Sequence, residues 1–594
     1  MLNWLFGDAG GASRRDVKKM FEREKLSDFL PYRSYCPTTQ TYDLHDGYFG
    51  YLWEIQPVPY AGEAIITAVK RLLTMDLPKS AIMQFILFPD PYIDDYLDRY
   101  QSLKLRRQEV VQANVKSFVK YWKENQNGVD CMRGIPLRNY RVFIALKSDE
   151  LIDPDIVSGL KESLNKFGVR HVPDEGRDGL VAILRRMFSK MNSRKSGSVE
   201  PSIPLNKQVL DGGLEYSFKG NVAKIGENYA RCFTPQAFPK TVSPELLNRL
   251  FGGMMGVTDD VRQITAPYMF SVTVFFKENK KELKTKANVT GFQKGGAKFS
   301  TELERRTEEY QWISTVLESG EKILKFVPVM WIFGESEEKV RDAVSRAKGI
   351  WDDLNFPVQD ESYLMKPLFV MSLPFGFYDI GKNLKVLERD FMAPVSTLAN
   401  LVPVQADYRG AGKPSVLMFG RKGQMVTVDL FDHRINNHNF FVGAESGAGK
   451  SFMLNYLLNQ YYAQGTKIRI VDLGYSYQKV CSLMGGRFLD LGADGKLCIN
   501  PFDFRASDDE DRDLGIQTAS AALALMVSSA SGTSLDEESF NLLRMASRWV
   551  VNSGKGGIGV DAAREFLATF PANVTEAYQG SVDFLIQKSQ DARI

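Results

Sequence analysis

The sequence predicts an N-terminal α+β domain followed by an α/β domain, and three observations lead to this prediction. Short strand-like segments and helical segments are mixed throughout the N-terminal part of the chain, which favours an α+β arrangement. A glycine-rich turn then joins the short apolar segment Asn439–Ala444 to a helical segment, as in a βα unit. A second apolar segment, Lys467–Val471, follows at the spacing of a right-handed crossover. We therefore expect a polar leader at 1–25, an α+β platform domain at 26–380, a linker at 381–430 and the α/β domain at 431–594.

The composition indicates a soluble globular protein. Hydrophobic residues make up 44% of the 594 residues and charged residues 25%, and the length allows about two to four domains. A formal net charge of +3 is too balanced to indicate nucleic-acid or membrane binding by charge alone. The five cysteines show no CxxC pairing, so we expect reduced thiols rather than a disulfide framework or a zinc site.

The N-terminal segment Met1–Phe21 does not have the pattern of a signal peptide. Its apolar run is short, and its basic residues follow that run instead of preceding it. No window of the sequence reaches 18 apolar residues, so we expect no membrane span and only peripheral membrane association.

Within the platform domain, the spacing of apolar residues predicts alternating strands and helices. Leu26–Val58 alternates apolar and polar residues between turn residues, which is typical of short antiparallel strands. Gly62–Pro78 has apolar residues at helical spacing instead. Further strands are expected at Ser80–Asp90, Tyr140–Lys147, Lys166–Val172, Met269–Lys277 and Ile323–Gly334, and further helices at Asp178–Ser193 and at Ser336–Asn355, with Ser336 as N-cap.

A lysine-rich stretch interrupts this pattern at about 277–320. It carries seven lysines between Lys277 and Lys298, and we expect a long charged helix or a helical hairpin with a solvated face. A surface that contacts DNA or lipid is the alternative. It is less favoured because no aromatic residues are interleaved with the lysines.

Two other segments have simple patterns. Met418–Asp432, in the expected linker, reads as a pair of short strands with Lys422 and Gly423 in the turn. Asp508–Asn552, near the C-terminal end of the chain, has helical spacing.

Ala444–Ser451 fits the pattern of a phosphate-binding loop, with alanine in place of the first glycine. Glycines at 447 and 449 allow a tight turn in which successive N–H groups face one centre. Lys450 is expected to reach the β- and γ-phosphates of ATP, and the hydroxyl of Ser451 to ligate Mg²⁺. The helix that follows directs its positive dipole end to the same place. The expected nucleotide-binding residues are Ala444, Glu445, Ser446, Gly447, Ala448, Gly449, Lys450, Ser451 and Phe452.

Alternatives remain open at two points of this site. A glycine-rich turn with an incidental lysine is the competing interpretation of the loop, and the flanking strand and helix patterns argue against it. Asp472 ends the second apolar segment, at the edge of the sheet where open α/β folds bind ligands. It is a candidate Mg²⁺ ligand, although an aspartate that caps the turn before Tyr475 fits the sequence at least as well.

Several motifs together resemble a known family. The segments "FFVGAESGAGKSF", "VDLGYSYQKVCSLMGGRFLDL" and "CINPFDF", with "FLPYRSYCPTTQTYDLHDGYFGYLWEIQPV" near the N-terminus, resemble the conjugative transfer ATPases of type IV secretion systems, most closely the F-type TraC group. The resemblance implies a platform domain followed by a RecA-like motor that binds ATP and Mg²⁺ through Lys450 and Ser451. It also implies hexamers at the cytoplasmic face of the inner membrane, in contact with membrane and coupling-protein components, that power pilus assembly and the transfer of DNA or protein.

The sequence also departs from the pattern of this family. After Lys450 we find no apolar strand that ends in Asp-Glu and no arginine finger, so we expect an α/β domain that is incomplete at its C-terminal end. ATP hydrolysis needs such groups, whereas phosphate binding relies mostly on the local backbone. A nucleotide-binding scaffold without hydrolysis is therefore the alternative to a motor. A DNA-translocating coupling protein is less favoured because no membrane span is expected.

Overall fold

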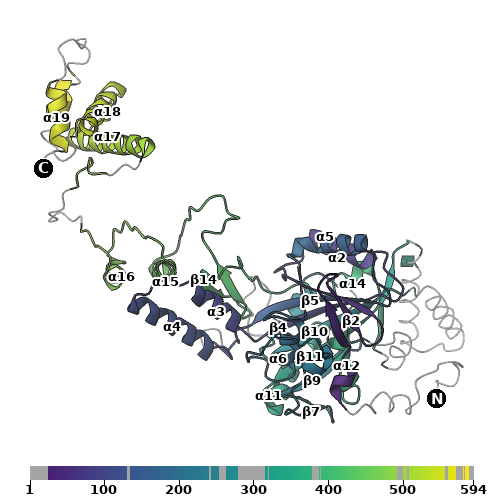
Figure 1. Cartoon of the computed structure of the whole chain (residues 1–594). Helices are drawn as coiled ribbons and strands as arrows, with labels where there is room; N and C mark the ends of the chain where they lie inside the picture. The colour runs from purple at the N-terminus through teal and green to yellow at the C-terminus, as the bar shows by residue number, and fades with distance from the viewer. Residues whose placement is uncertain are drawn as a thin grey trace, which may run out of the picture. The chain divides into compact units, whose positions relative to one another are not determined.

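The computed structural model of the chain divides into two compact units. The first unit extends to Tyr477 and the second begins at Gln478. Figure 1 draws both with the labels used below. The described residues are 25–129, 134–239, 242–252, 263–277, 315–316, 318, 320–377, 387, 389–490, 499–504, 508–554, 559–569, 580 and 582–587.

An antiparallel sheet forms the centre of the first unit. Its strands follow the order β1-β2-β3-β5-β4-β10-β11-β9-β8-β7, with β6 beside β3, β12 beside β9 and β13 beside β11. The described strands of this sheet are β1 (Tyr32–Cys36), β2 (Thr41–Leu44), β3 (Phe49–Ile55), β4 (Ile82–Asp90), β5 (Asn139–Ser148), β6 (Arg170–His171), β7 (Tyr216–Ser217), β8 (Ala223–Ile225), β9 (Asn228–Pro235), β10 (Tyr268–Phe275), β11 (Ile323–Gly334), β12 (Val358–Asp360) and β13 (Phe391–Pro394).

The central strands are apolar on both faces because helices cover both sides of the sheet. Along β4, Phe85 and Leu87 belong to one apolar core, while Ile86 and Phe88 belong to the core on the opposite face. This alternation follows from the two-residue period of a strand. The first core packs against α2 (Glu63–Thr74), α5 (Pro154–Leu164), α8 (Leu246–Leu250), α11 (Glu337–Asp353) and α14 (Val395–Leu398), and the second against α6 (Leu180–Met187), α7 (Leu205–Gln208) and α12 (Met365–Ser372).

The predicted strands and helices of the platform are confirmed where the structure describes them, except at Lys166–Val172. There a 3-10 helix (Asn165–Phe167) precedes the two-residue strand β6. β11 covers the predicted strand, and α11 begins directly after Ser336. The Oγ atom of Ser336 accepts a hydrogen bond from the backbone N–H of Lys339, at 3.2 Å, as expected for an N-cap. The lysine-rich stretch lies almost entirely outside the described residues, as does the polar leader.

Replacing Ser336 with alanine is expected to lower the free energy of unfolding of the first unit by about 1 kcal/mol, because the substitution leaves a helix N–H without its acceptor. Chemical denaturation followed by tryptophan fluorescence measures the change. Ser345→Ala is the matched control, since Ser345 lies on the exposed face of the same helix. Equal losses in the two variants would show that the cap makes no contribution.

The structure differs from the sequence prediction between residues 391 and 428. Where a linker was expected, β13 pairs with β11, and Val395 and Leu398 are buried in the core. The physical reason is that these apolar side chains cover part of one sheet face, so the segment packs instead of extending. The hairpin within it is confirmed: β14 (Val416–Phe419) pairs with β15 (Met425–Val428).

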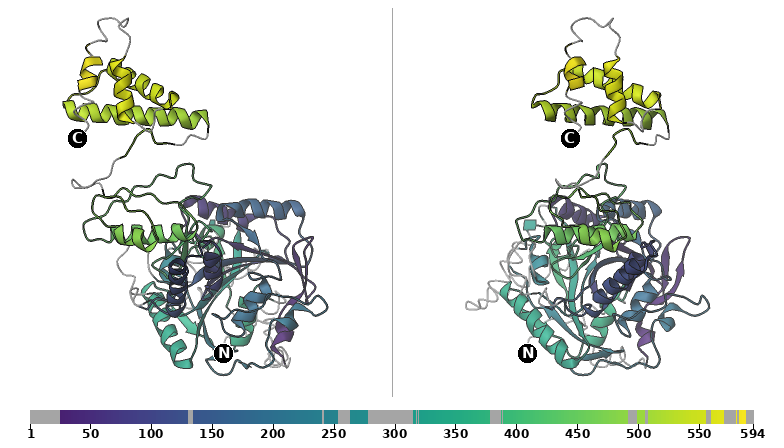
Figure 2. Two further views of the ribbon diagram at one scale, coloured as in Figure 1. Left: turned by 60° about the vertical axis from the view of Figure 1, so that its left-hand side comes forward. Right: turned by 90° about the vertical axis from the view of Figure 1, so that its left-hand side faces the viewer.

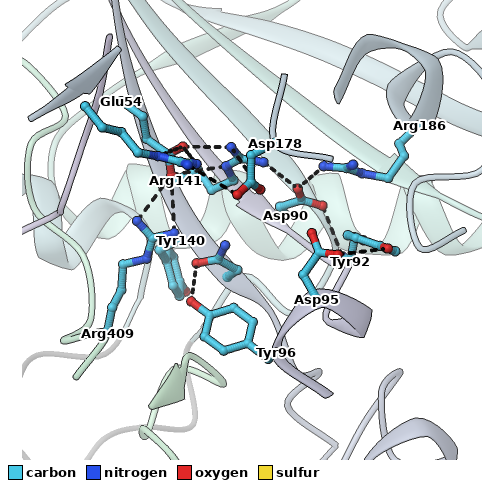
Figure 3. A network of polar contacts seen from close by, with 12 residues as sticks. Glu54, Asp90, Tyr92, Asp95, Tyr96, Tyr140, Arg141, Asp178, Arg186 and Arg409 are labelled. Atoms are coloured by element: carbon cyan, nitrogen blue, oxygen red, sulfur yellow. Dashed lines mark hydrogen bonds and ion pairs between the residues drawn. The ribbon is translucent and has the colours of Figure 1, made fainter. Parts of the chain in front are cut away.

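A buried network of charges joins this segment to the sheet (Figure 3). Glu54 on β3 pairs with Arg141 on β5, with 2.7 Å between Oε2 and Nη2, and with Arg409, with 3.2 Å between Oε1 and Nη1. Arg141 also contacts Asp90 on β4, at 3.4 Å. Burial by itself raises the pKa of Glu54, but the guanidinium groups of Arg141, Arg409 and Arg170 together hold it well below its usual value.

The second unit contains a small helical bundle, which confirms the predicted helical tail. Apolar side chains of α17 (Asp509–Ser531), α18 (Glu537–Asn552) and α19 (Val560–Ala568) share one core. In contrast to the expectation from the sequence, α17 is long and apolar enough to cross a membrane, with a hydropathy of 1.3 and 33% of its window buried. A core helix of a small bundle meets the same criterion, so this finding among the described residues does not by itself indicate a span.

Candidate nucleotide-binding site

The glycine-rich loop leads directly into a helix, as the sequence predicts. Helix α15 (Lys450–Ala463) begins at the lysine of the motif. Gly447 and Gly449 have φ angles of 82° and 91°, a left-handed backbone conformation that residues with a Cβ atom rarely adopt. A Cβ atom added at either glycine would meet nothing within 4 Å. The loop therefore requires glycine for its backbone conformation, and the space beside both α-carbons is open.

The side chains of the predicted loop are accessible to solvent. Every residue from Ala444 to Lys450 is exposed, and Phe452 is 81% exposed. The turn closes with a hydrogen bond of 3.2 Å from the N–H of Ala448 to the carbonyl oxygen of Glu445. Ser451 lies next to Lys450 in the first turn of α15, so the expected phosphate and Mg²⁺ residues are neighbours at the N-terminal end of one helix.

The predicted strands on either side of this helix are not formed in the described structure. Asn439–Ala444 and Lys467–Val471 have no assigned strand, and most of their large apolar residues are exposed, with Phe441 at 96% and Val471 at 98%. The prediction of strands at these two segments is wrong for the described structure. A parallel strand needs neighbours that satisfy its N–H and C=O groups, and no described strand pairs with either segment.

Asp472 caps a turn. Its Oδ1 atom accepts a hydrogen bond of 3.0 Å from the N–H of Gly474, and its Oδ2 atom accepts one of 3.4 Å from the N–H of Tyr477. This geometry matches the turn-capping interpretation of Asp472. Its role as a Mg²⁺ ligand stays a prediction. The amide of Asn455 on α15 reaches the carbonyl oxygen of Ser476 at 3.5 Å, which links this turn to the helix.

The C-terminal end of α15 is built into the first unit, as Figures 1 and 2 show. It lies against β14 and against α3 (Asp94–Ser102) and α4 (Glu109–Glu124). The Tyr456 hydroxyl donates to the carbonyl oxygen of Leu417 at 2.6 Å, and the Tyr100 hydroxyl donates to Oε1 of Gln460, also at 2.6 Å. These hydrogen bonds hold the half of the helix that lies away from the loop.

Two basic residues between α3 and α4 complete this attachment, and sequence reasoning missed them. Lys104 and Arg106 donate to carbonyl oxygens at the end of α15, about 350 positions further along the chain. Burial lowers the pKa of Lys104 to about 7. No local sequence signal indicates this contact, because it joins residues that only the tertiary structure brings together.

Comparisons with known proteins match two segments of the chain. A family model described as "TraC protein" matches residues 26–377, which is more than half of the chain. The chain belongs to the TraC family. A second model, described as "TraG P-loop domain", matches residues 416–529 and so includes the glycine-rich loop and Asp472. The predicted P-loop domain in the C-terminal half of this TraC-family chain is thereby confirmed.

A curated relative covers most of the chain. The protein named "Protein TraC" from Escherichia coli (strain K12) is 22% identical over 595 residues, which include 94% of this chain and 66% of that protein. The chain thus spans about two thirds of the length of the relative. The predicted relationship to the TraC-type conjugative transfer family is confirmed.

Proposed function

We propose that this TraC-family chain binds ATP with Mg²⁺ through residues 444–452 and acts as a motor subunit of a conjugative type IV secretion system. The observation that supports this most is the glycine-rich loop, whose left-handed glycines lead into α15 within the segment matched by a P-loop domain. In this proposal, segments 439–444 and 467–472 become strands of a RecA-like sheet. The motor would power pilus assembly and the transfer of DNA or protein.

The residues of the loop fit a nucleotide phosphate. Open space beside Gly447 and Gly449 lets a phosphate approach the backbone N–H groups. The ammonium group of Lys450 and the positive end of the α15 dipole favour negative charge at the same place. Bound Mg²⁺ would neutralise charge on the β- and γ-phosphates, with the hydroxyl of Ser451 as its protein ligand. Asp472 is a candidate second contact to the metal.

The assembly proposed for the chain follows the family. We propose that the chain forms a homo-oligomer, with six subunits as the expected number. We expect this assembly at the cytoplasmic face of the inner membrane. There it would contact membrane components and the coupling protein, and contact with DNA would be made during transfer. Crosslinking and mass photometry in the presence and absence of ATP test the subunit number. A strictly monomeric chain under both conditions would contradict this part of the proposal.

Direct binding of a fluorescent N-methylanthraniloyl derivative of ATP tests the central proposal. Unlabelled ATP and ADP are expected to displace the probe, adenosine is not, and EDTA should weaken binding because the metal bridges the phosphates. A chain that shows no saturable binding of the probe, or that binds adenosine equally well, would contradict a phosphate-loop site.

A second candidate function is a nucleotide-binding scaffold without hydrolysis. The unpaired segments Asn439–Ala444 and Lys467–Val471 favour it, because a hydrolytic site needs acidic and basic groups held rigidly around the γ-phosphate. Phosphate release measured beside binding separates the two functions. Saturable binding with no release above a protein-free blank supports the scaffold, and steady release supports the motor.

A further inference from the structure

The C-terminal end of α15 is capped by basic side chains from outside the helix. The last turn of α15 contains no basic residue. Lys104, which is only 6% exposed, donates from Nζ to the carbonyl oxygens of Ser415 at 2.7 Å and Gln460 at 3.1 Å. A cation at this end of a helix interacts favourably with the helix dipole and satisfies carbonyls that have no partner within the helix.

Arg106 forms hydrogen bonds with the chain where α15 ends. Its Nε atom donates to the carbonyl oxygen of Tyr462 at 2.7 Å, and Nη2 donates to that of Thr466 at 3.2 Å. Its backbone N–H donates to the carbonyl oxygen of Ala463 at 3.0 Å. The guanidinium group also lies over the ring of Tyr462, 4.0 Å from its centroid. These contacts fix the position of the end of the helix.

The opposite end of α15 is not held in this way. Lys450 and Phe452 are exposed, whereas Gln460, Tyr461 and Ala463 are buried. A helix of 14 residues extends about 21 Å and behaves as a stiff rod at this length. The contacts of Lys104 and Arg106 with its C-terminal end therefore determine the orientation of the helix, and with it the position of the loop at its N-terminal end.

We propose that Lys104 and Arg106 are positioning residues for the phosphate loop, and that they couple nucleotide affinity to the α3–α4 segment of the platform. The proposal rests on the proposed nucleotide site and deepens it. A partner that binds the platform could move α3 and α4. Such a movement would reorient α15 and change the position of Lys450 and Ser451 relative to the phosphates. Because linkage is reciprocal, bound nucleotide must in turn stabilise the contacts made by Arg106.

Arg106→Gln tests the coupling, with Arg107→Gln as the matched control. Arg107 is exposed and adjacent to Arg106 in the sequence, and Arg107→Gln removes the same charge. Arg106→Gln is expected to weaken binding of the fluorescent ATP derivative by about fivefold to tenfold, in the range of typical coupling between sites. Arg107→Gln should bind as the wild type does. Arg106→Lys should recover part of the affinity, because the ammonium group still reaches one carbonyl but cannot stack or bridge.

Hydrogen–deuterium exchange supplies a readout that a merely stabilising contact would not change. ATP is expected to slow amide exchange in residues 104–112 of the wild type. These residues contact the C-terminal end of α15, and the loop lies at its N-terminal end. Without nucleotide, Arg106→Gln should speed exchange in the first turns of α15. Lys104→Met serves as the second variant if Arg106→Gln does not fold.

The outcomes separate this inference from the proposed function. Binding of the probe by Arg106→Gln and Lys104→Met with wild-type affinity, or unchanged exchange at 104–112 upon binding, overturns the inference alone. A wild type that binds no nucleotide overturns the proposed function, and exchange at the start of α15 in the variants then still decides whether these residues position the loop.

Discussion

Replacing Lys450 with alanine is expected to lower the affinity for ATP by about 10- to 100-fold. A hydrogen bond to a charged group contributes about 1.5–3 kcal/mol, and about 1.4 kcal/mol corresponds to a factor of ten in affinity. Lys450 is exposed at the first position of α15 and forms no ion pair among the described residues. The substitution should therefore leave the melting temperature unchanged while it removes the phosphate contact.

Lys166→Ala is the control for this experiment. Lys166 is exposed in the same unit and lies outside the proposed site, and its removal changes the net charge equally. Titration with the fluorescent ATP derivative, beside an assay of phosphate release, measures both variants. Equal affinity in Lys450→Ala and the wild type would exclude the glycine-rich loop as the nucleotide site. Release that depends on Lys450 would support the motor, and lysine-dependent binding without release would support the scaffold.

Glu54→Gln is expected to destabilise the first unit by about 3–5 kcal/mol, the usual cost of removing one partner from a buried ion pair. The variant keeps the shape of the side chain but leaves Arg141, Arg170 and Arg409 without the carboxylate that they share. Figure 3 shows Arg141 and Arg409 converging on Glu54. Denaturant unfolding followed by tryptophan fluorescence should show a lower midpoint.

Glu150→Gln is the control, because Glu150 is exposed in the same unit and loses the same charge. A midpoint that falls equally in both variants would mean that net charge, and not the buried network, is responsible. Glu54→Gln with the stability of the wild type would mean that the three arginines are satisfied in another way.

The effect of Glu54→Gln should also depend on pH. Its folded-state pKa lies below the ordinary value of 4.5, so the carboxylate contributes its stability fully above pH 4.5. That contribution is lost as the pH falls below 4.5 and Glu54 becomes protonated, first in the unfolded state. The difference between the wild type and Glu54→Gln should therefore be constant near neutral pH and become smaller in strong acid.

Local elements of this protein could be predicted from the order of its residues. The strand Ile323–Gly334 and the helix capped by Ser336 are predicted by a continuous apolar run and a serine before two glutamates. The glycine-rich loop and the start of α15 at Lys450 are equally local, because left-handed glycines and a helix start depend on neighbouring residues. Resemblance to the TraC family rested on such local motifs.

Contacts between distant residues could not be predicted in this way. Phe85 on β4 pairs with Val272 on β10, and no short-range pattern specifies this partner. The apolar residues in Asn439–Ala444 have the composition of a buried strand, but composition does not supply a neighbour, and the segment is exposed in the described structure.

The order of the residues was enough to locate the strands of the platform, the cap of α11 and the loop before Lys450, because the pattern that marks each of them is local. The contact of Arg409 with Glu54 and the contacts of Arg106 with the end of α15 became visible only in the folded chain. Both contacts join residues about 355 positions apart. Such pairs form only when packing of the sheet and its helices has already brought their elements together.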